Sequence, residues 1–185
     1  MSIIDEIVEE YHAKLGACRS TLQICGDSPF TRALAKRCRE WGVPYAMVED
    51  TDPGYPVVVD YEVKPGAHAG HSIDDAYTLS ACAEGILRLC ERIGVAGKVV
   101  TIVGRRHAVK GLAAALLAAD ATVCVCHSKT EPGVAEWFEE MADVIVDSSA
   151  SDGINIFKTG EVFSNAGIGR LTTAILAYRA SIWEG

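Results

Sequence analysis

The sequence predicts an α/β protein in which a parallel sheet has helices on both faces. Three short apolar runs, at 98–103, 121–126 and 143–146, have the continuous Val- and Ile-rich composition of strands that are buried on both sides. Segments with helical periodicity lie between them. Strand, helix, strand, helix, strand is the order that builds a doubly wound sheet, so residues 81–185 are expected to form a Rossmann-like domain.

A second, smaller α/β region is predicted for residues 1–80. It begins with an amphipathic helix over 2–15, where apolar side chains recur at helical spacing opposite four carboxylates. The elements expected next are a strand, a helix ended by a glycine, a second strand and a Gly- and His-containing loop, at 21–25, 30–41, 57–63 and 64–72. The uncovered apolar face of the first helix leads us to expect a homodimer.

The remaining elements of the Rossmann-like domain follow from the same signals. Helices are predicted at 81–94, 109–119, 134–141 and 171–183. Residues 154–163 are expected to form two short strand segments joined by a tight turn at 158–160.

Composition argues against several classes of partner. With 49% hydrophobic residues, a net charge of -8 and a pI near 5.1, the chain lacks the clustered cations that nucleic acid or an anionic membrane would require. No apolar run approaches the roughly 18 residues of a membrane-spanning helix. The acidic N-terminal segment is unlike a signal peptide, so we expect a cytoplasmic protein.

The seven cysteines are expected to be reduced core residues, because most lie within apolar periodic segments. Cys124, Cys126 and His127 could suggest a metal, but no second pair with ligand spacing completes a tetrahedral set. No metal is therefore predicted.

A glycine follows the first predicted strand of the Rossmann-like domain directly. Gly104 comes after 98–103 and precedes a short basic loop and an Ala/Leu-rich helix. This order lets backbone N–H groups near a helix N-terminus hold a pyrophosphate.

The end of the next strand favours NADP over NAD. In NAD sites an acidic residue about twenty positions beyond the first glycine binds the ribose hydroxyls. Here that place is taken by 127–130, and two arginines stand at the end of the preceding strand. The residues that we expect to bind the extra phosphate are Arg105, Arg106, His127, Ser128, Lys129 and Thr130. The alternative is that the charged ones are only solvated surface groups.

Several segments resemble the bifunctional methylenetetrahydrofolate dehydrogenase/cyclohydrolase family. GKVVTIVGRRHAVKG followed by ATVCVCHSKT is similar to its G-R-S-x-x-V-G loop and C-H-S-K-T strand end. SACAEGI, DGIN and AGIGRLT are similar to its P-C-T-P-x-G-I, D-x-G-I-N and G-G-V-G-P-M-T segments, in the same order. The loop departs from the family in having Arg106 for a serine and Lys110 for a glycine.

The resemblance implies roles for individual residues. Arg105 and Ser128 would contact the 2′-phosphate of NADP, and the cofactor groove would be lined by Gly104, Gly167, Gly169 and Thr172. Residues 1–80 would be a reduced form of the folate-binding domain.

The family's active Tyr and Lys are missing from this reduced region. Two alignments of S-x-x-Y-x-x-x-K place Thr31 and Ala35, or Phe30 and Leu34, at those positions. Lys36 is the nearest lysine and would need a change of helix register to replace the family's lysine. By looser matches, Asp60 is the counterpart of an active Gln, and His68 lies near the place of the pterin-binding Asp. We therefore name Lys36, Asp60 and His68 as candidate catalytic residues.

Two functions from different classes follow. The first is NADP-dependent hydride transfer on a folate one-carbon unit or another small substrate, without cyclohydrolase activity because the lysine is lost. The alternative is a non-catalytic nucleotide-binding or sensor module that has lost folate chemistry.

Overall fold

The chain divides into two compact units. The computed structural model describes residues 1–51, 55–59, 72–73, 76–109, 111–149, 153–158 and 161–184. One unit consists of 1–4 and 78–171, and the other of 5–77 and 172–185. The boundary between residues 80 and 81 that we expect from the sequence stays a prediction.

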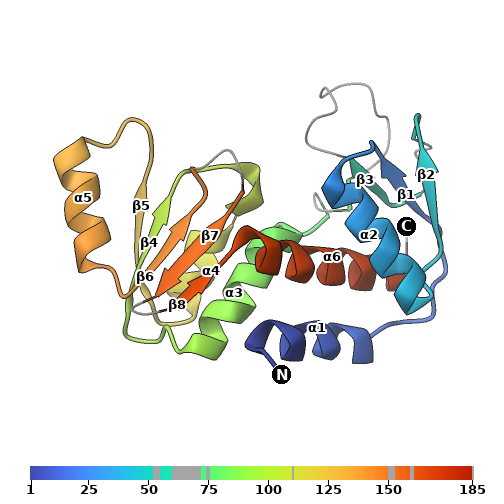
Figure 1. Ribbon diagram of the computed structural model, residues 1–185, viewed down its shortest axis with the longest axis horizontal. Helices are drawn as coiled ribbons and strands as arrows, with labels where there is room; N and C mark the ends of the chain where they lie inside the picture. Colours follow the sequence, from blue (N-terminus) through green and yellow to red (C-terminus); the bar gives the residue numbers. More distant parts are fainter. Residues whose placement is uncertain are drawn as a thin grey trace. The chain divides into compact units, whose positions relative to one another are not determined.

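The first unit is built on a five-stranded sheet in the order β5-β4-β6-β7-β8 (Figure 1). Its strands are β4 (Val99–Val103), β5 (Thr122–Cys126), β6 (Val144–Asp147), β7 (Asn155–Lys158) and β8 (Glu161–Phe163). β4 pairs in parallel with both β5 and β6, whereas β7 runs antiparallel to β6 and to β8. The α/β, Rossmann-like fold is confirmed, and the β7–β8 hairpin extends its parallel part.

Helices lie on the two sides of this sheet, with α5 on one side and α3 and α4 on the other (Figure 1). They are α3 (Ala81–Ile93), α4 (Leu112–Ala118) and α5 (Pro132–Met141), and a short 3-10 turn covers His107–Val109. Thr101 of β4 donates its hydroxyl to Phe138 O of α5 at 2.9 Å, which ties that helix to the sheet. The core is formed by fully buried aliphatic side chains: Ile86, Leu89, Val100, Ile102, Leu112, Leu116, Val146 and Ile156.

The second unit contains a three-stranded parallel sheet in the order β2-β1-β3. Its elements are α1 (Ile3–Ala13), β1 (Leu22–Cys25), α2 (Pro29–Trp41), β2 (Tyr45–Val48) and β3 (Val57–Val59). α6 (Asn165–Ser181) passes from the first unit into the second after Leu171. The hydrophobic core of this unit includes five residues with no exposed surface: Leu22, Ile24, Leu34, Cys38 and Ile175.

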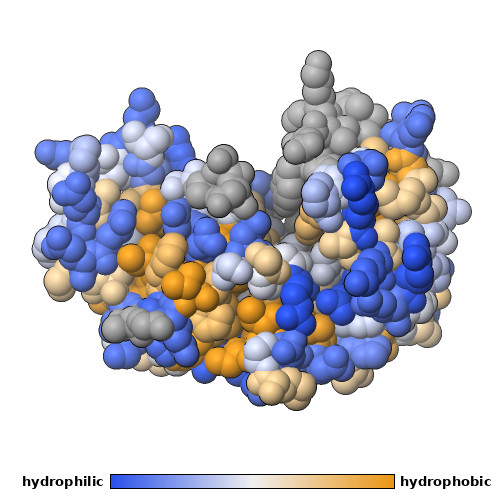
Figure 2. Space-filling model, viewed as in Figure 1, coloured by the Kyte–Doolittle hydropathy of each residue, from blue (hydrophilic) through white to orange (hydrophobic). Residues whose placement is uncertain are grey.

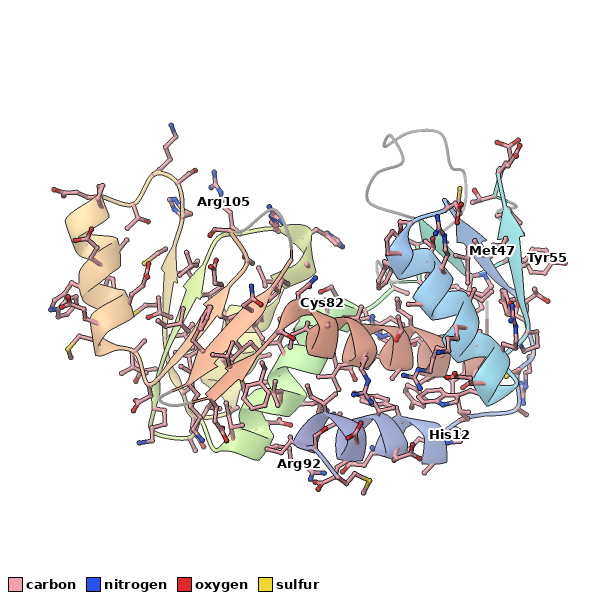
Figure 3. The ribbon with its side chains drawn as sticks, in the orientation of Figure 1. His12, Met47, Tyr55, Cys82, Arg92 and Arg105 are labelled. Carbon is pink, nitrogen blue, oxygen red and sulfur yellow. The ribbon has the colours of Figure 1, made fainter. Side chains whose placement is uncertain are left out.

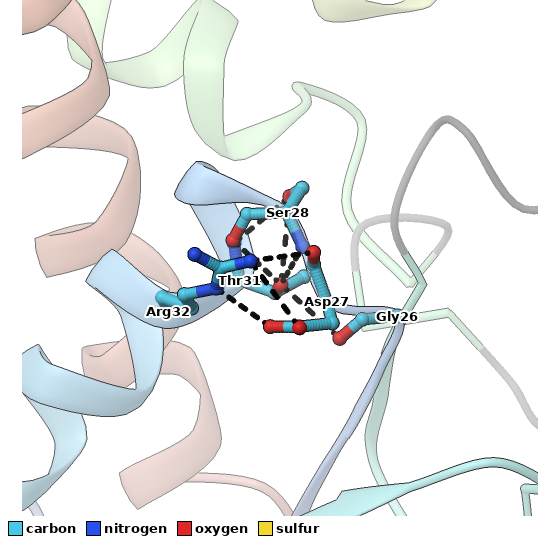
Figure 4. Close-up of polar contacts among 5 residues, drawn as sticks. All are labelled: Gly26, Asp27, Ser28, Thr31 and Arg32. Carbon is cyan, nitrogen blue, oxygen red and sulfur yellow. Dashed lines mark hydrogen bonds and ion pairs between the residues drawn. The ribbon is translucent and has the colours of Figure 1, made fainter.

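The start of α2 shows why the helix forms where it does. Ser28 Oγ accepts a hydrogen bond from Thr31 N at 3.2 Å, and Thr31 Oγ1 accepts one from Ser28 N at 2.9 Å (Figure 4). This reciprocal capping box satisfies two N–H groups that the first turn leaves unpaired. Pro29 at the first helical position loses nothing, because it has no N–H to pair. Gly42, with a φ of +68°, ends the helix.

The apolar face of α1 is covered within the chain, contrary to our expectation. Ile7, Val8 and Tyr11 are between 1% and 4% exposed. The Tyr11 ring lies 5.4 Å from that of Tyr178 on α6, centroid to centroid. The homodimer expected from the sequence therefore loses this support, because the apolar surface is already removed from water.

Three elements differ from the predictions. β2 was not predicted. The helix expected from residue 109 begins at Leu112, because residues 107–109 form a 3-10 turn and Gly111 has a φ of +79°. The last helix begins at Asn165 rather than at 171, since the Ser164 carbonyl starts its hydrogen-bonded turns in spite of two early glycines.

No helix in the described part of the chain is both long enough and apolar enough to span a bilayer.

Candidate functional site

The carboxyl ends of β4, β5 and β6 meet at one edge of the five-stranded sheet. Val103 is in register with Cys126 of β5 and with Asp147 of β6. Beyond the last pair, Gly104 N donates to Cys126 O at 2.7 Å. The segments that begin at 104, 127 and 148 therefore leave the sheet side by side, and Arg105 projects from this edge (Figure 3).

Gly104 is held where no other residue fits without strain. Its φ is +95°, and an added Cβ would lie 2.5 Å from Ser148 Oγ. Ser148 is fixed in turn, because its hydroxyl and its backbone N–H both donate to Val103 O at 2.8 Å. The glycine thus brings the loop backbone against the end of β6 and leaves no side chain over the sheet edge.

A tight turn follows β5. His127 N donates to Thr130 Oγ1 at 3.0 Å, and Thr130 N donates to His127 O at 2.8 Å. Lys129 N donates to His127 Nδ1 at 3.1 Å. These hydrogen bonds stabilise the turn without using the side chains of Ser128 and Lys129. Both side chains are exposed and can therefore contact a ligand.

Two arginines stand on the neighbouring loop. Arg105 and Arg106 are both exposed, and Arg106 Nη2 donates to Ser149 O at 3.3 Å. Asp147 ends β6 with a carboxylate, and its Oδ1 accepts from Ser149 N at 2.8 Å and from Ser149 Oγ at 2.7 Å. The loop after β4 and the turn after β5 therefore offer cationic and hydroxyl donors, which suit a phosphate.

The loop after β4 is anchored by Ser80, a residue that the sequence did not single out. Ser80 Oγ donates to Ala108 O at 2.7 Å and accepts from Ala83 N at 3.0 Å, so it caps α3 and fixes the loop at once. It is fully buried. An added Cβ on Gly111, at the far end of the loop, would lie 2.6 Å from Thr78 O. The available signal was a serine directly before a predicted helix.

Sequence comparison decides which family this site belongs to. Residues 80–175, more than half of the chain, match the model of the tetrahydrofolate dehydrogenase/cyclohydrolase, NAD(P)-binding domain. The chain belongs to this family. The family resemblance that we inferred from the sequence motifs is confirmed. The site at the carboxyl ends of β4, β5 and β6 lies in an NAD(P)-binding domain.

Relatives agree with this assignment. The bifunctional protein FolD of Latilactobacillus sakei is 42% identical over 100 residues, which cover 50% of this chain and 35% of that protein. The chain spans roughly a third of the length of the curated relatives that it matches, between 26% and 37%.

Solved structures share the fold at low sequence identity. A 5,10-methylenetetrahydrofolate dehydrogenase from the silkworm Bombyx mori superposes with a TM-score of 0.69 at 17% identity, covering 96% of this chain and 93% of that one. The Trypanosoma brucei N5,N10-methylenetetrahydrofolate dehydrogenase-cyclohydrolase, solved with NADP cofactor and an inhibitor, gives a TM-score of 0.64 at 16% identity, with coverage of 96% and 92%.

The residues at the edge fit an NAD(P) molecule. A Cβ at position 104 would collide with Ser148, so only glycine lets the loop backbone pass close to the end of β6 on its way to the following helix. Arg105, Ser128 and Lys129 add the charge and the hydrogen-bond donors that a further phosphate requires.

The other glycines predicted to line the cofactor groove differ in their surroundings. An added Cβ on Gly167 would lie 2.6 Å from Ile4 Cδ1, whereas nothing lies within 4 Å of one on Gly169. Both glycines belong to the first unit. Thr172 is 7% exposed and belongs to the second unit. Gly167 thus permits close packing in this NAD(P)-binding domain, and Gly169 faces open space.

The candidate catalytic residues are not brought together by the described residues. Lys36 lies on the exposed side of α2, 76% exposed, with Nζ 3.8 Å from Glu40 Oε1. α2 runs from Pro29 to Trp41 and buries Thr31, Leu34, Ala35 and Cys38 on its other side. The register change that Lys36 would need is absent from this helix. Asp60 and His68 lie outside the described residues, so their roles stay predictions.

The described residues contain no group of three or more His, Cys, Asp and Glu side chains that could hold a metal ion. Cys124 is half-buried and Cys126 is buried, and both are free thiols. Burial raises the pKa of the Cys126 thiol, and so disfavours the thiolate that metal binding requires.

Proposed function

We propose that this chain binds NADP, with the 2′-phosphate held by Arg105, Ser128 and Lys129. The main support comes from the end of β5. A turn with Ser128 and Lys129 lies there, at the position where NAD sites have a carboxylate that binds the ribose. The T. brucei structure solved with NADP supports the choice.

We further propose hydride transfer between NADP and a one-carbon unit on a folate, or a related small substrate. When bound, the nicotinamide supplies the hydride chemistry. The chain's contribution is to position the cofactor: Gly104 lets the loop after β4 pack against the end of β6, and Ser80 keeps that loop in place. Hydride transfer depends on holding two reactants in register more than on a side-chain base, so loss of the family's Tyr and Lys is compatible with it.

A second candidate is a nucleotide-binding module without catalysis. It is favoured by α2, where Thr31, Leu34 and Ala35 are buried and Lys36 points to solvent. With no lysine in the expected place, the proton transfer of a cyclohydrolase has no obvious agent.

The NADP proposal is tested by titrating wild type and Arg105→Ala with NADP and with NAD. Losing one charged hydrogen-bond partner costs about 1.5–3 kcal/mol, so NADP affinity should fall roughly 10- to 150-fold. NAD affinity should change little, because NAD lacks the 2′-phosphate. Arg88→Ala on α3, which removes an exposed guanidinium paired with Glu91, is the matched control. Equal losses for both nucleotides in Arg105→Ala would contradict the proposal.

Catalysis is tested separately with methylenetetrahydrofolate and NADP. An increase in absorbance from reduced NADP at micromolar enzyme supports the dehydrogenase. Tight NADP binding with no turnover and no folate binding would instead select the non-catalytic module.

The homodimer remains part of this proposal. Phe157 on β7 and Val162 on β8 are 39% and 66% exposed, and Figure 2 shows hydrophobic surface over this part of the first unit. β8 is also an edge strand. Multi-angle light scattering should give twice the mass of the chain, and Val162→Lys should return it to the monomer.

A further inference from the structure

The second unit has a basic surface that the proposed function does not use. A hollow of about 360 Å³ lies between α2 and β2. We name it the α2–β2 surface, and it is lined by Asp27, Arg32, Ala35, Lys36, Arg39, Tyr45 and Met47. Met47 is 46% exposed, so the hollow has an apolar wall as well as charged ones (Figure 3).

Positive charge is in excess on this surface, although the chain as a whole is acidic. Arg32, Lys36 and Arg39 are four and three positions apart on α2, so they form one row along the helix. Asp27 pairs with Arg32, with Oδ1 2.6 Å from Nε (Figure 4). Arg39 instead donates to the neutral Tyr45 hydroxyl at 2.9 Å.

The second carboxylate near the row is shared. Glu40 lies 3.8 Å from Lys36 Nζ and 3.6 Å from Arg37 Nη1. Lys36 therefore keeps much of its charge unneutralised and is 76% exposed. The row ends in two cations that can receive carboxylates from a partner.

β2 offers a main-chain edge beside this row. It is the outer strand in the order β2-β1-β3, and among the described residues it pairs only with β1. Pro44 O accepts from Leu22 N at 2.9 Å, so backbone groups of alternate residues after it face β1. The N–H and C=O groups of Tyr45 and Met47 therefore point away from β1, toward the open edge.

We propose that the α2–β2 surface binds an extended acidic segment of a partner protein, which adds to β2 as a further strand. The Tyr45 and Met47 side chains line the hollow from the same face of the sheet, so alternate side chains of an added strand would also point toward α2.

The spacing of the row fits such a segment. Seven helical positions separate Arg32 from Arg39, or about 10 Å along the axis. Neighbouring cations are about 4.5–6 Å apart along the axis, and alternate side chains of a strand recur about every 7 Å, a difference that the long Lys and Arg side chains can span. A second copy of the chain fits poorly, because pairing two β2 edges would bring two rows of cations together.

The test uses wild-type protein and a fluorescein-labelled peptide of four Glu-Val repeats, followed by fluorescence anisotropy. Binding should be saturable and should weaken as salt is raised. A peptide of four Lys-Val repeats should not bind. N-methylation of one alternate set of peptide nitrogens should abolish binding, because it removes the N–H groups facing β2, whereas methylation of the other set should leave binding intact.

Protein variants separate the two contributions. Lys36→Glu with Arg39→Glu should weaken binding roughly tenfold or more, from two reversed ion pairs. Arg19→Glu with Arg88→Glu, two exposed arginines elsewhere on the chain, should leave it unchanged. Met47→Pro should remove binding while retaining the far-UV circular dichroism of the wild type, since that N–H is not used by β1.

Three results would overturn the proposal. The first is no binding at peptide concentrations up to about 1 mM, which is the weak end of specific recognition. The second is equal binding of the two N-methylated peptides, and the third is an equal loss of affinity in the two double variants. Equal binding of the N-methylated peptides would mean attraction by charge alone. None of these outcomes depends on whether NADP binds.

Discussion

Gly104→Ala should destabilise the protein through the close contact at the end of β6. A non-glycine residue at a φ of +95° costs about 1–2 kcal/mol of backbone strain. The new methyl group would lie 2.5 Å from Ser148 Oγ, so that hydroxyl must move and its hydrogen bond to Val103 O is lost. A hydrogen bond of this kind contributes about 0.5–1.5 kcal/mol, which gives a total of about 1.5–3.5 kcal/mol.

Urea unfolding followed by circular dichroism measures this loss. Gly169→Ala is the matched control, because its added methyl meets no atom within 4 Å and lies in a helix, where alanine should gain about 0.5–1 kcal/mol. Ser148→Ala removes the colliding hydroxyl. In the Ser148→Ala protein, Gly104→Ala should therefore cost less by the contribution of the lost hydrogen bond, while the cost of the backbone strain remains. If Gly104→Ala unfolds within about 0.5 kcal/mol of the wild type, the close approach described here does not exist.

Three further outcomes are expected. Ser80→Ala should lower the free energy of unfolding, measured by urea titration, by about 1–2 kcal/mol, and it should also weaken NADP binding. An unchanged affinity for NADP would mean that the hydrogen bond from Ser80 to Ala108 O is not needed to hold the loop. Burial raises the pKa of Cys38 and Cys90 to about 12, so iodoacetamide at pH 8 should label the half-buried Cys18 and Cys124 before this pair. Mass spectrometry measures the order, and early labelling of Cys38 or Cys90 would contradict the prediction. The Val99 N–H at the start of β4 donates to Asp143, and together with Lys98 it lowers the pKa of that carboxyl below 3.8. The ionised carboxylate therefore stabilises the fold above pH 3.8, and this contribution is lost as the pH falls through the lower folded-state pKa. In that pH window, the stability of Asp143→Asn should depend less on acid than that of the wild type.

The order of strands and helices in the first unit could be predicted because buried strands are continuous apolar runs. β2 could not, since its four residues are followed by charged ones and only its pairing with β1 makes it a strand. The start of α6 was hidden by Gly167 and Gly169, which lower helix propensity. Tertiary contacts override that weak local preference, as the packing of Ile4 against Gly167 illustrates.

The cluster at the sheet edge was accessible from the sequence for a geometric reason. Parallel strands end at a common edge, so Arg105 and the 127–130 turn had to be near neighbours once the strands were placed. The residues that support them were not accessible. Ser80 reaches Ala108 and Ser148 reaches Val103 across 28 and 45 positions of sequence, and no local pattern encodes such contacts.

The turn after β5 has a consequence for molecules designed to occupy this edge. Because Nδ1 of His127 accepts the Lys129 amide proton, the hydrogen-bond network assigns the neutral ring its own proton on Nε2. The imidazole therefore presents a donor to its surroundings and has no lone pair to offer. An inhibitor reaching this ring should carry a carbonyl or sulfonyl oxygen there, and an amino group in the same position would be repelled.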